Sequence, residues 1–272
     1  MPELPLGEHV LRWSERGTGD PVVLVHSSGM SSRQWRRLEA ELSTTHRVAS
    51  PDLLGYGESS PFPDTERFHF ALDQLALERL VDRLASEAGP VHLVGHSYGG
   101  FLALLVALHR PQSVRSVAVY EPVSFGVLRS VEDEPALRTL RATDESHPFP
   151  ETPQAIEAWL EGFIDYWNGD GGWRALPESA QQSFRATARK MIGEVRTLGA
   201  DRTPHQAYAT LAMPVLLLGS EVSTLAADRV LEILAATVPR ARRERIAGAT
   251  HMGPLTHPSQ VNALIAAHVR AS

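Results

Sequence analysis

The apolar and polar positions of this chain follow two patterns that alternate along it. Most of the short apolar runs are rich in valine and leucine and lack a polar residue at every second position, which is typical of parallel strands buried on both faces. The predicted strands are residues 21–27, 46–53, 90–97, 114–122, 214–221 and 241–247. Segments with the apolar spacing of helices lie between and after them, at residues 32–43, 72–89, 99–110, 225–238 and 258–270.

This alternation of strands and helices predicts an α/β fold. Strand–helix–strand units form parallel sheets, and their right-handed crossovers place helices on both faces of the sheet. We therefore expect a doubly wound, mostly parallel sheet. Residues 10–25 are expected to add one or two antiparallel strands at its N-terminal edge.

One region departs from the alternation, because no convincing strand pattern occurs between residues 123 and 210. Its segments 152–173 and 177–198 have helical patterns, separated by turns that contain glycine and proline. We predict a core domain formed by residues 1–122 and 211–272, with residues 123–210 inserted as a helical cap. Aromatic side chains of the insertion can build its own small core or line a binding pocket beneath it, and the two roles are compatible. The candidates for the pocket are Trp159, Phe163 and Trp167.

Composition excludes several classes of protein. Hydrophobic residues make up 43% and charged residues 21% of the 272 positions, as in ordinary globular domains. A net charge of −6 argues against a nucleic-acid binder, since phosphate neutralisation needs a basic surface. The absence of cysteine excludes disulfides and thiolate metal sites. No metal-binding or nucleotide-binding motif occurs, so we expect neither a metal nor a cofactor.

The sequence also lacks signals for secretion or membrane insertion. The first residues, MPELPLGEHVLRW, have neither the basic nor the apolar region of a signal peptide. The longest unbroken apolar run, residues 101–108, is far too short to span a membrane. We therefore expect a cytoplasmic protein without a membrane span, a monomer or homodimer, whose partner is a small-molecule substrate.

The sequence GHSYGG, residues 95–100, stands between a predicted buried strand and an apolar helix. A serine in a G-x-S-x-G sequence at such a junction can occupy a sharp turn that lifts its hydroxyl above the carboxyl edge of the sheet. Gly95 and Gly99 would allow the close packing that this turn needs, and Gly100 relieves the next turn. Ser97 is therefore a candidate nucleophile. The alternative is an ordinary tight turn with an incidental serine.

The segment LVGHSYGG resembles the nucleophile elbow of the α/β-hydrolase superfamily. Three further segments are similar to this superfamily in order and spacing: the strand-to-helix loop VVLVHSSGMSSRQW, the segment HRVASPDLLGYGESS and the late histidine loop GATHMGPLTHPSQV. The resemblance covers the chain except for the insertion. It implies the α/β-hydrolase fold and a Ser–His–acid triad, and it leaves the substrate open because this fold hosts many chemistries.

Histidine can take the proton of a serine hydroxyl near neutral pH. His251 follows the last predicted strand, lies in a loop that contains glycine and precedes the last predicted helix. The resemblance implies that the base comes from this place in the chain. We expect other roles for His26, which supports the loop after its strand, for His96, which packs beside the nucleophile, and for His257 at a helix start.

The acid departs from the superfamily pattern. It is usually placed three residues after the glycine that ends the strand 214–221, but this position holds Val222. Three candidates remain: Glu121, Glu221 and Asp228. Glu121 ends the strand after the elbow helix, from which some superfamily members, haloalkane dehalogenases among them, take the acid, and side chains at that sheet edge converge on the active site. We prefer Glu121, because Glu221 needs a reshaped loop and Asp228 lies inside a predicted helix. The alternative role for Glu121 is to anchor the insertion.

The resemblance further implies two backbone N–H groups that bind a developing oxyanion. One is the N–H of Tyr98, and the other comes from the loop after the first buried strand, by position Ser28, with Ser27 next. The serine hydroxyls of this loop can instead cap the following helix. Ser27 and His96 are also candidates for substrate contacts, and Asp52 is expected to shape a turn near the site.

These residues predict a cofactor-independent, esterase-like serine hydrolase that works through an acyl-enzyme. Its substrate is expected to be an ester, thioester, lactone or activated C–C bond of a small-to-medium apolar acyl compound. Ser97 in place of an aspartate argues against dehalogenase or epoxide-hydrolase chemistry, which needs a carboxylate nucleophile. The alternatives are a non-hydrolytic member of the fold, such as a lyase, a cyclase or a haloperoxidase-like protein, and a catalytically silent ligand-binding protein.

Overall fold

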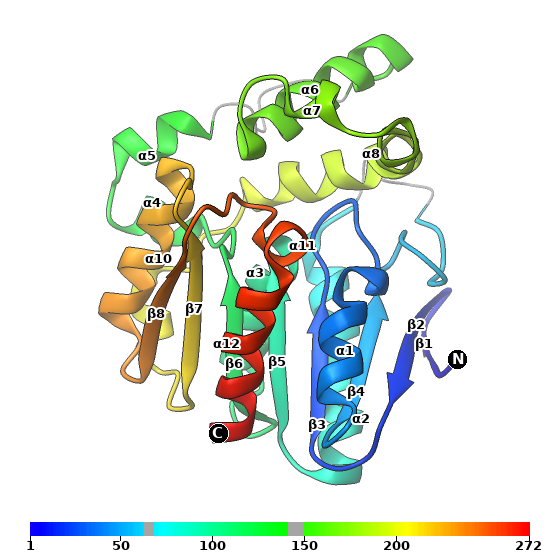
Figure 1. The fold of residues 1–272 in the computed structure, drawn as a ribbon, viewed down its shortest axis with the longest axis vertical. Coiled ribbons are helices and arrows are strands. Elements are labelled where there is room, and N and C mark those ends of the chain that lie inside the picture. The colour runs from blue at the N-terminus through cyan, green and yellow to red at the C-terminus, as the bar shows by residue number, and fades with distance from the viewer. Residues whose placement is uncertain (63–67, 141–149) are drawn as a thin grey trace.

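A mostly parallel sheet forms the centre of the protein. The computed structural model describes residues 1–62, 68–140 and 150–272. The strands are β1 (Glu3–Leu6), β2 (His9–Arg16), β3 (Pro21–Val25), β4 (Arg47–Asp52), β5 (Val91–His96), β6 (Val114–Tyr120), β7 (Val215–Ser220) and β8 (Ala241–Ile246). Over the described residues they form one sheet in the order β1-β2-β4-β3-β5-β6-β7-β8 (Figure 1). The strands from β3 to β8 pair in parallel, whereas β1 and β2 are antiparallel, so the predicted fold class is confirmed.

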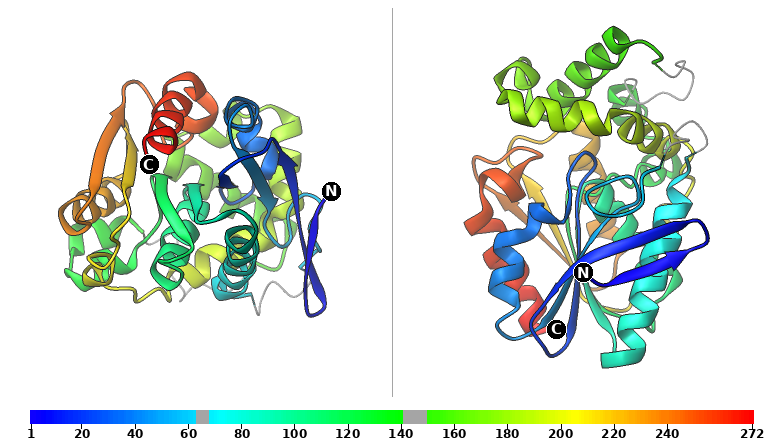
Figure 2. Two further views of the ribbon diagram at one scale, coloured as in Figure 1. Left: turned by 90° about the horizontal axis from the view of Figure 1, so that it is seen from below. Right: turned by 90° about the vertical axis from the view of Figure 1, so that its right-hand side faces the viewer.

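Helices cover both faces of this sheet. The helical elements of the described residues are the 3₁₀ turn η1 (Ser32–Trp35) and helices α1 (Arg36–Leu42), α2 (Phe70–Ala88), α3 (Tyr98–His109), α4 (Gly126–Ser130), α5 (Glu134–Thr139), α6 (Pro153–Asn168), α7 (Gly172–Ala175), α8 (Glu178–Leu198), α9 (His205–Tyr208), α10 (Leu225–Thr237), α11 (Gly253–Thr256) and α12 (Pro258–Ala271). Helices α1 and α12 lie on one face, and α2, α3 and α10 on the other (Figure 2). None of the helices in the described ranges is both long and apolar enough to cross a membrane.

Strand β3 shows why the apolar runs are continuous. All five of its residues are buried. Val22 and Leu24 belong to the core beneath α1 and α12, whereas Val23 and Val25 belong to the core beneath α2, α3 and α10. Because successive side chains of a strand point to opposite faces, a strand between two helix layers needs an apolar residue at every position. Burial of each such side chain contributes about 1.5–3 kcal/mol.

The region from residue 123 to 210 contains helices and no strand among its described residues, as the sequence predicts. Helices α6, α7 and α8 lie above the carboxyl ends of the central strands (Figure 1). Local signals explain the bounds of α6: Thr152 accepts a hydrogen bond from Ala155 N–H, Pro153 opens the helix, and Gly169 ends it with φ of 90°. The division into a core domain and a cap domain remains a prediction.

Candidate active site

Ser97 lies in the turn between β5 and α3, where the chain reverses sharply at the carboxyl edge of the sheet. Its backbone has φ of 54° and ψ of −115°, a strained conformation for a residue with a side chain. Two hydrogen bonds hold the turn: the N–H of Ser97 donates to Tyr120 O on β6, and the carbonyl of Ser97 accepts from Phe101 N–H, each at 2.9 Å. The surrounding structure thus imposes this strained conformation on Ser97 at the sheet edge, where the residue is buried.

The glycines beside Ser97 are required by close contacts. A Cβ added to Gly95 would lie 2.3 Å from the carbonyl oxygen of Gly99, and one added to Gly99 would lie 2.4 Å from the carbonyl oxygen of His26. Both contacts are with backbone, which cannot move aside as a flexible side chain can. The turn therefore needs glycine at both positions, because α3 packs directly against β5 and β3.

Glu121 and His251 meet at the same edge of the sheet. Glu121 follows β6, and His251 lies in the loop after β8. The carboxylate Oε2 of Glu121 is 2.7 Å from Nδ1 of His251, and the side chains are 0% and 4% exposed. Burial alone would raise the pKa of Glu121, but the hydrogen bonds and charge of His251 and the hydrogen bonds from Ser220 outweigh it and lower the pKa to about 2. Glu121 is therefore ionised in the working pH range of most enzymes.

The second oxygen of Glu121 is held by Ser220, a residue that the sequence did not single out. Ser220 ends β7 and donates to Oε1 of Glu121 with both its N–H, at 2.9 Å, and its hydroxyl, at 2.5 Å. With Oε1 occupied in this way, Oε2 faces His251. The signal in the sequence was weak, because a serine at a strand end is common.

The other two candidate acids have different partners. Glu221 Oε2 accepts a hydrogen bond from Gly248 N–H at 2.7 Å. Asp228 lies in α10 and forms ion pairs with Arg243 and Arg245 of β8. The structure therefore brings Glu121 to the imidazole of His251 and directs the other two carboxylates elsewhere.

His96 holds His251 beside the elbow. Nε2 of His96 donates to the backbone carbonyl of His251 at 2.8 Å, and the two ring centroids are 5.0 Å apart. Its Nδ1 is 3.2 Å from the amide nitrogen of Gln34. Burial, reinforced by the neighbouring His251, lowers the pKa of His96 to about 3, so this ring is neutral. Both ring nitrogens are thus used within the protein, which favours a supporting role over the expected contact with substrate.

The hydroxyl of Ser97 and the ring of His251 are not hydrogen-bonded to each other in the described part of the chain. The Nδ1 atom of His251 faces Glu121, so Nε2 is the nitrogen available to a serine hydroxyl. In structures without substrate, such catalytic hydrogen bonds are often long and tighten only in the complex. The residues follow β5, β6 and β8, whose carboxyl ends lie at one edge of the sheet.

In the loop after β3, the N–H groups of the two serines that were candidates for an oxyanion donor have different surroundings. The N–H of Ser27 donates to Oε1 of Gln34 at 3.0 Å, so it is already used. The N–H of Ser28 has no hydrogen-bond partner within the described residues. Tyr98 is the first residue of α3, and its N–H therefore has no partner inside the helix. Gln34, which the sequence did not single out, thus binds both Ser27 and the His96 ring.

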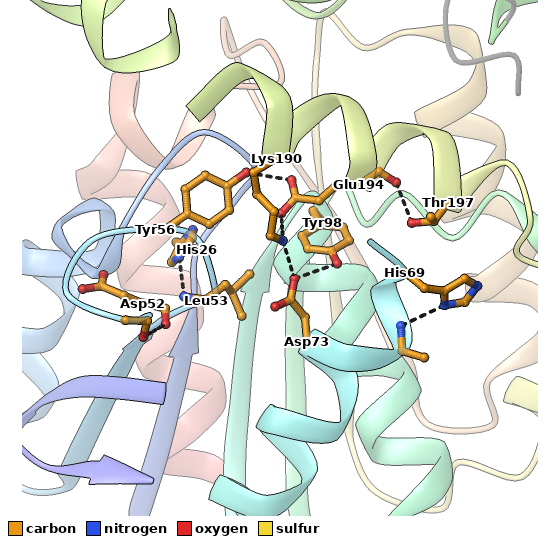
Figure 3. A network of polar contacts seen from close by, with 12 residues as sticks. His26, Asp52, Leu53, Tyr56, His69, Asp73, Tyr98, Lys190, Glu194 and Thr197 are labelled. Carbon is orange, nitrogen blue, oxygen red and sulfur yellow. Dashed lines mark hydrogen bonds and ion pairs between the residues drawn. The ribbon is translucent and has the colours of Figure 1, made fainter. Parts of the chain in front are cut away.

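His26 and Asp52 hold the loop after β3 and the neighbouring turn by hydrogen bonds to backbone N–H groups. Nε2 of His26 accepts a hydrogen bond from Leu53 N–H at 3.0 Å (Figure 3). Asp52 accepts hydrogen bonds from Ser32 N–H at 2.7 Å and from Glu58 N–H at 2.9 Å. These contacts agree with the expected roles, in which His26 supports the loop and Asp52 shapes a turn.

A row of aromatic side chains on α6 leads to the imidazole. Trp167 stacks on His251 with ring centroids 3.9 Å apart and an angle of 22° between the planes. Phe163 contacts Trp167 edge to face, at a centroid distance of 6.4 Å. Trp159 stacks on Phe163 at 5.0 Å. The aromatic residues expected near a pocket therefore lie one turn apart on α6, and the last of them covers His251.

The sequence model of a family described as "Alpha/beta hydrolase family" matches residues 22–264. Among curated relatives, the dihydrolipoyllysine-residue acetyltransferase component of the acetoin cleaving system of Cupriavidus necator is 26% identical over 95% of this chain. A haloalkane dehalogenase of Agrobacterium fabrum is 37% identical over 47% of it. The chain spans less than two thirds of the length of these two relatives, 66% and 40%. The (E)-2-((N-methylformamido)methylene)succinate hydrolase of Acinetobacter baylyi is 25% identical over 91% of this chain and 89% of its own length.

Solved structures with the same fold include a thermophilic esterase from Thermogutta terrifontis and an epoxide hydrolase from Vigna radiata. The esterase has a TM-score of 0.73 and 22% identity, over 97% of this chain and 94% of the other. The epoxide hydrolase has a TM-score of 0.76 and 18% identity, over 100% of this chain and 97% of the other. At these identities the likeness shows the fold, which serves more than one chemistry.

Proposed function

This chain belongs to the alpha/beta hydrolase family, and on that premise we propose that it is a cofactor-independent serine hydrolase. The observation that carries the proposal is the contact of 2.7 Å between Glu121 Oε2 and His251 Nδ1, at the sheet edge where the elbow presents Ser97. A carboxylate in this position keeps the proton of the imidazole on Nδ1, which leaves Nε2 free to accept one.

In the proposed mechanism, Ser97 attacks the carbonyl carbon of the substrate while His251 takes its proton through Nε2. Glu121 stays ionised and stabilises the imidazolium that forms. The negative charge on the former carbonyl oxygen is bound by the N–H groups of Tyr98 and Ser28, which have no partner within the described protein. His251 then gives its proton to the leaving group, and a water molecule activated by the same imidazole hydrolyses the acyl-enzyme.

The proposed substrate is a small-to-medium apolar acyl compound. The aromatic row Trp159, Phe163 and Trp167 supports this choice, because it offers flat apolar surface next to the base. Attack of Ser97 on the carbonyl carbon of an ester, a thioester, a lactone or a ketone with an activated C–C bond gives a tetrahedral intermediate in each case. The relatives include proteins named as a lipase and as a 2-hydroxymuconate semialdehyde hydrolase, and these names support hydrolysis as the reaction.

The proposal is tested by covalent labelling together with turnover. A fluorophosphonate probe should label the wild-type protein at Ser97, because only an activated serine reacts, and p-nitrophenyl esters should be hydrolysed. Ser97→Ala should lose the label and at least about 10³-fold in kcat, while its circular dichroism and melting temperature stay close to those of the wild type. Equal labelling of both proteins would contradict the role of Ser97.

The same experiment separates the alternatives. A catalytically silent binding protein would take up no label. A lyase, cyclase or haloperoxidase-like protein would be labelled at Ser97 but would give products other than the acid and the leaving group. Mass spectrometry of the products from a panel of esters, lactones and thioesters distinguishes these reactions from net hydrolysis.

A further inference from the structure

A row of buried polar side chains crosses the boundary between α8 and the core. At its centre, the ammonium of Lys190 on α8 lies 2.7 Å from Asp73 Oδ2 on α2 and 2.8 Å from Glu194 Oε1, one turn further along α8 (Figure 3). The lysine side chain is 4% exposed and both carboxylates are 0% exposed. Charged side chains are almost never buried in this way unless they are paired, so the three residues depend on one another.

One end of this row reaches the elbow. Tyr98 donates its hydroxyl to Oδ2 of Asp73 at 3.0 Å, the same oxygen that binds Lys190. The N–H of Tyr98 is one of the two proposed oxyanion donors. The side chain of Tyr98 is therefore held by Asp73, and Asp73 is held by Lys190 of α8.

The other end reaches the oxyanion loop. Tyr56 donates its hydroxyl to Oε2 of Glu194 at 2.9 Å and accepts a hydrogen bond from Gly29 N–H at 3.1 Å. Gly29 directly follows Ser28, whose N–H is the second proposed donor. A continuous path of hydrogen bonds and ion pairs thus joins the two halves of the proposed oxyanion hole, and it passes through Lys190.

Helix α8 also packs tightly on two loops that contribute residues to this path, the loop after β3 and the loop after β4. Gly29 has φ of 72°, and a Cβ there would lie 2.6 Å from a ring carbon of Phe184 and 2.9 Å from the sulfur of Met191. A Cβ on Gly55 would lie 3.2 Å from Cγ of Lys190. The helix therefore contacts the loop after β3 directly, and a shift of α8 would move this loop.

We propose that Lys190 is a positioning residue that sets the separation of the Tyr98 and Ser28 N–H groups. Through Lys190, this separation depends on the position of α8 on the core. This inference rests on the proposed function. Its physical basis is the short range of the interaction, because a donor stabilises an oxyanion only when it lies about 2.7–3.1 Å from the oxygen. Loss of Lys190 would leave Asp73 and Glu194 without their shared cation and release both ends of the path.

The test compares turnover with the binding of an inhibitor that mimics the tetrahedral state. In Lys190→Met, which keeps the length of the side chain, kcat on p-nitrophenyl butyrate should fall at least about 10-fold, since removal of a whole oxyanion donor costs about 10²-fold or more. KM should change by less than about 3-fold, because the ester itself makes little use of the hole. The inhibition constant of an alkyl trifluoromethyl ketone, whose adduct with Ser97 carries an oxyanion, should rise by the same factor as kcat falls.

Arg185→Met is the matched control on the same helix. Arg185 forms ion pairs with Glu157 at 2.8 Å and Glu178 at 2.9 Å, away from the path. This variant should keep the wild-type kcat, KM and inhibition constant even if it melts at a lower temperature. Tyr56→Phe breaks the path at another link without leaving a charge unpaired. In this variant kcat should also fall, by a smaller factor than in Lys190→Met.

The outcomes distinguish a positioning role of Lys190 from a purely structural one. A wild-type kcat and inhibition constant in folded Lys190→Met would overturn the inference, as would a loss of melting temperature without a change in kcat. If Lys190→Met does not fold, Tyr56→Phe decides: a fall in kcat that the inhibition constant follows supports the inference, and unchanged values overturn it. Absence of labelling and turnover in the wild-type protein would instead overturn the proposed function and this inference with it.

Discussion

Glu121 and His251 are 130 residues apart in the chain, yet Oε2 of the carboxylate lies 2.7 Å from Nδ1 of the imidazole. The carboxylate is also bound twice by Ser220, at 2.9 Å and 2.5 Å. These contacts make the strand end after β6, and not the loop after β7, the source of the acid in the proposed triad.

Glu121→Gln should lower kcat by about 10²–10⁴-fold, because an amide can place a donor against Nδ1 and so favour the wrong tautomer of His251. Steady-state hydrolysis of p-nitrophenyl butyrate measures this loss. Glu221→Gln is the control, since Glu221 binds Gly248 N–H and not the imidazole. A larger loss of kcat in Glu221→Gln than in Glu121→Gln would contradict the assignment.

Ser220→Ala should destabilise the protein by about 2 kcal/mol, since a buried hydrogen bond to a charged group contributes about 1.5–3 kcal/mol. It should also lower kcat, but less than Glu121→Gln does, because the N–H of residue 220 still binds Oε1. Urea unfolding and turnover provide the two measurements. Ser130→Ala is the control, because it removes a hydroxyl bound to the carbonyl of Val127 and to the N–H and Nδ1 of His205, and it should leave kcat unchanged. Equal effects of the two substitutions on kcat would rule out a special role for Ser220.

Gly99→Ala should destabilise the protein by about 3 kcal/mol or more, or prevent it from folding, because the new Cβ would lie 2.4 Å from the carbonyl oxygen of His26. Gly162→Ala provides the contrast. Gly162 lies inside α6 and a Cβ there meets nothing within 4 Å, so this change should stabilise the protein by about 0.5–1 kcal/mol through helix propensity. The melting temperatures of both variants test the pair, and a tolerated alanine at position 99 would show that the elbow is looser than these contacts indicate.

His92 makes the stability depend on pH at a site remote from the elbow. Burial, followed by the charges of Arg115 and His46, lowers its pKa from 6.5 to about 4. Its Nδ1 lies 2.8 Å from the hydroxyl of Ser116. Because the unfolded chain binds a proton here below pH 6.5 and the folded protein does not until about pH 4, the contribution of His92 to stability is present above pH 6.5 and is lost as the pH falls through this window.

His92→Gln removes this titration and can keep a hydrogen bond to Ser116. The free energy of unfolding of the wild type should therefore decrease more steeply than that of the variant between pH 6.5 and 4, the two values of the pKa for the unfolded and the folded protein. Urea unfolding at several pH values measures both curves. Parallel curves through this window would contradict the lowered pKa.

The order of strands and helices was accessible from local patterns. Every predicted parallel strand is present. Most of them are buried on both faces and need an apolar run such as Pro21–Val25, whereas in β8 only Ile246 is buried. The turn at Ser97 was equally accessible, since Gly95 and Gly99 stand at the spacing that its close contacts require. His251 could be placed because the resemblance to the α/β-hydrolase superfamily implies a base in the loop between the last strand and the last helix.

The partners of these residues could not be obtained in the same way. Three carboxylates were candidates for the acid of the triad. No motif in the sequence singles out Ser220, Gln34 or Lys190. Each of them acts through a hydrogen bond or ion pair to a segment far away in the chain: Ser220 to Glu121, Gln34 to His96, and Lys190 to Asp73. Sequence spacing carries no information on such contacts, because they depend on how separate elements pack.

Local residue patterns were thus sufficient for the fold class and for the strained turn that carries Ser97, since propensity and close packing act between neighbours along the chain. The loop that carries His251 required in addition the resemblance to the α/β-hydrolase superfamily. The sequence favoured Glu121 over Glu221 and Asp228 by its place at a strand end. Its contact with His251, and the linkage of α8 to the elbow, arose only when the chain was folded. A hydrogen bond requires donor and acceptor within about 3 Å and in line, and only the packing of distant strands and helices against one another meets that condition.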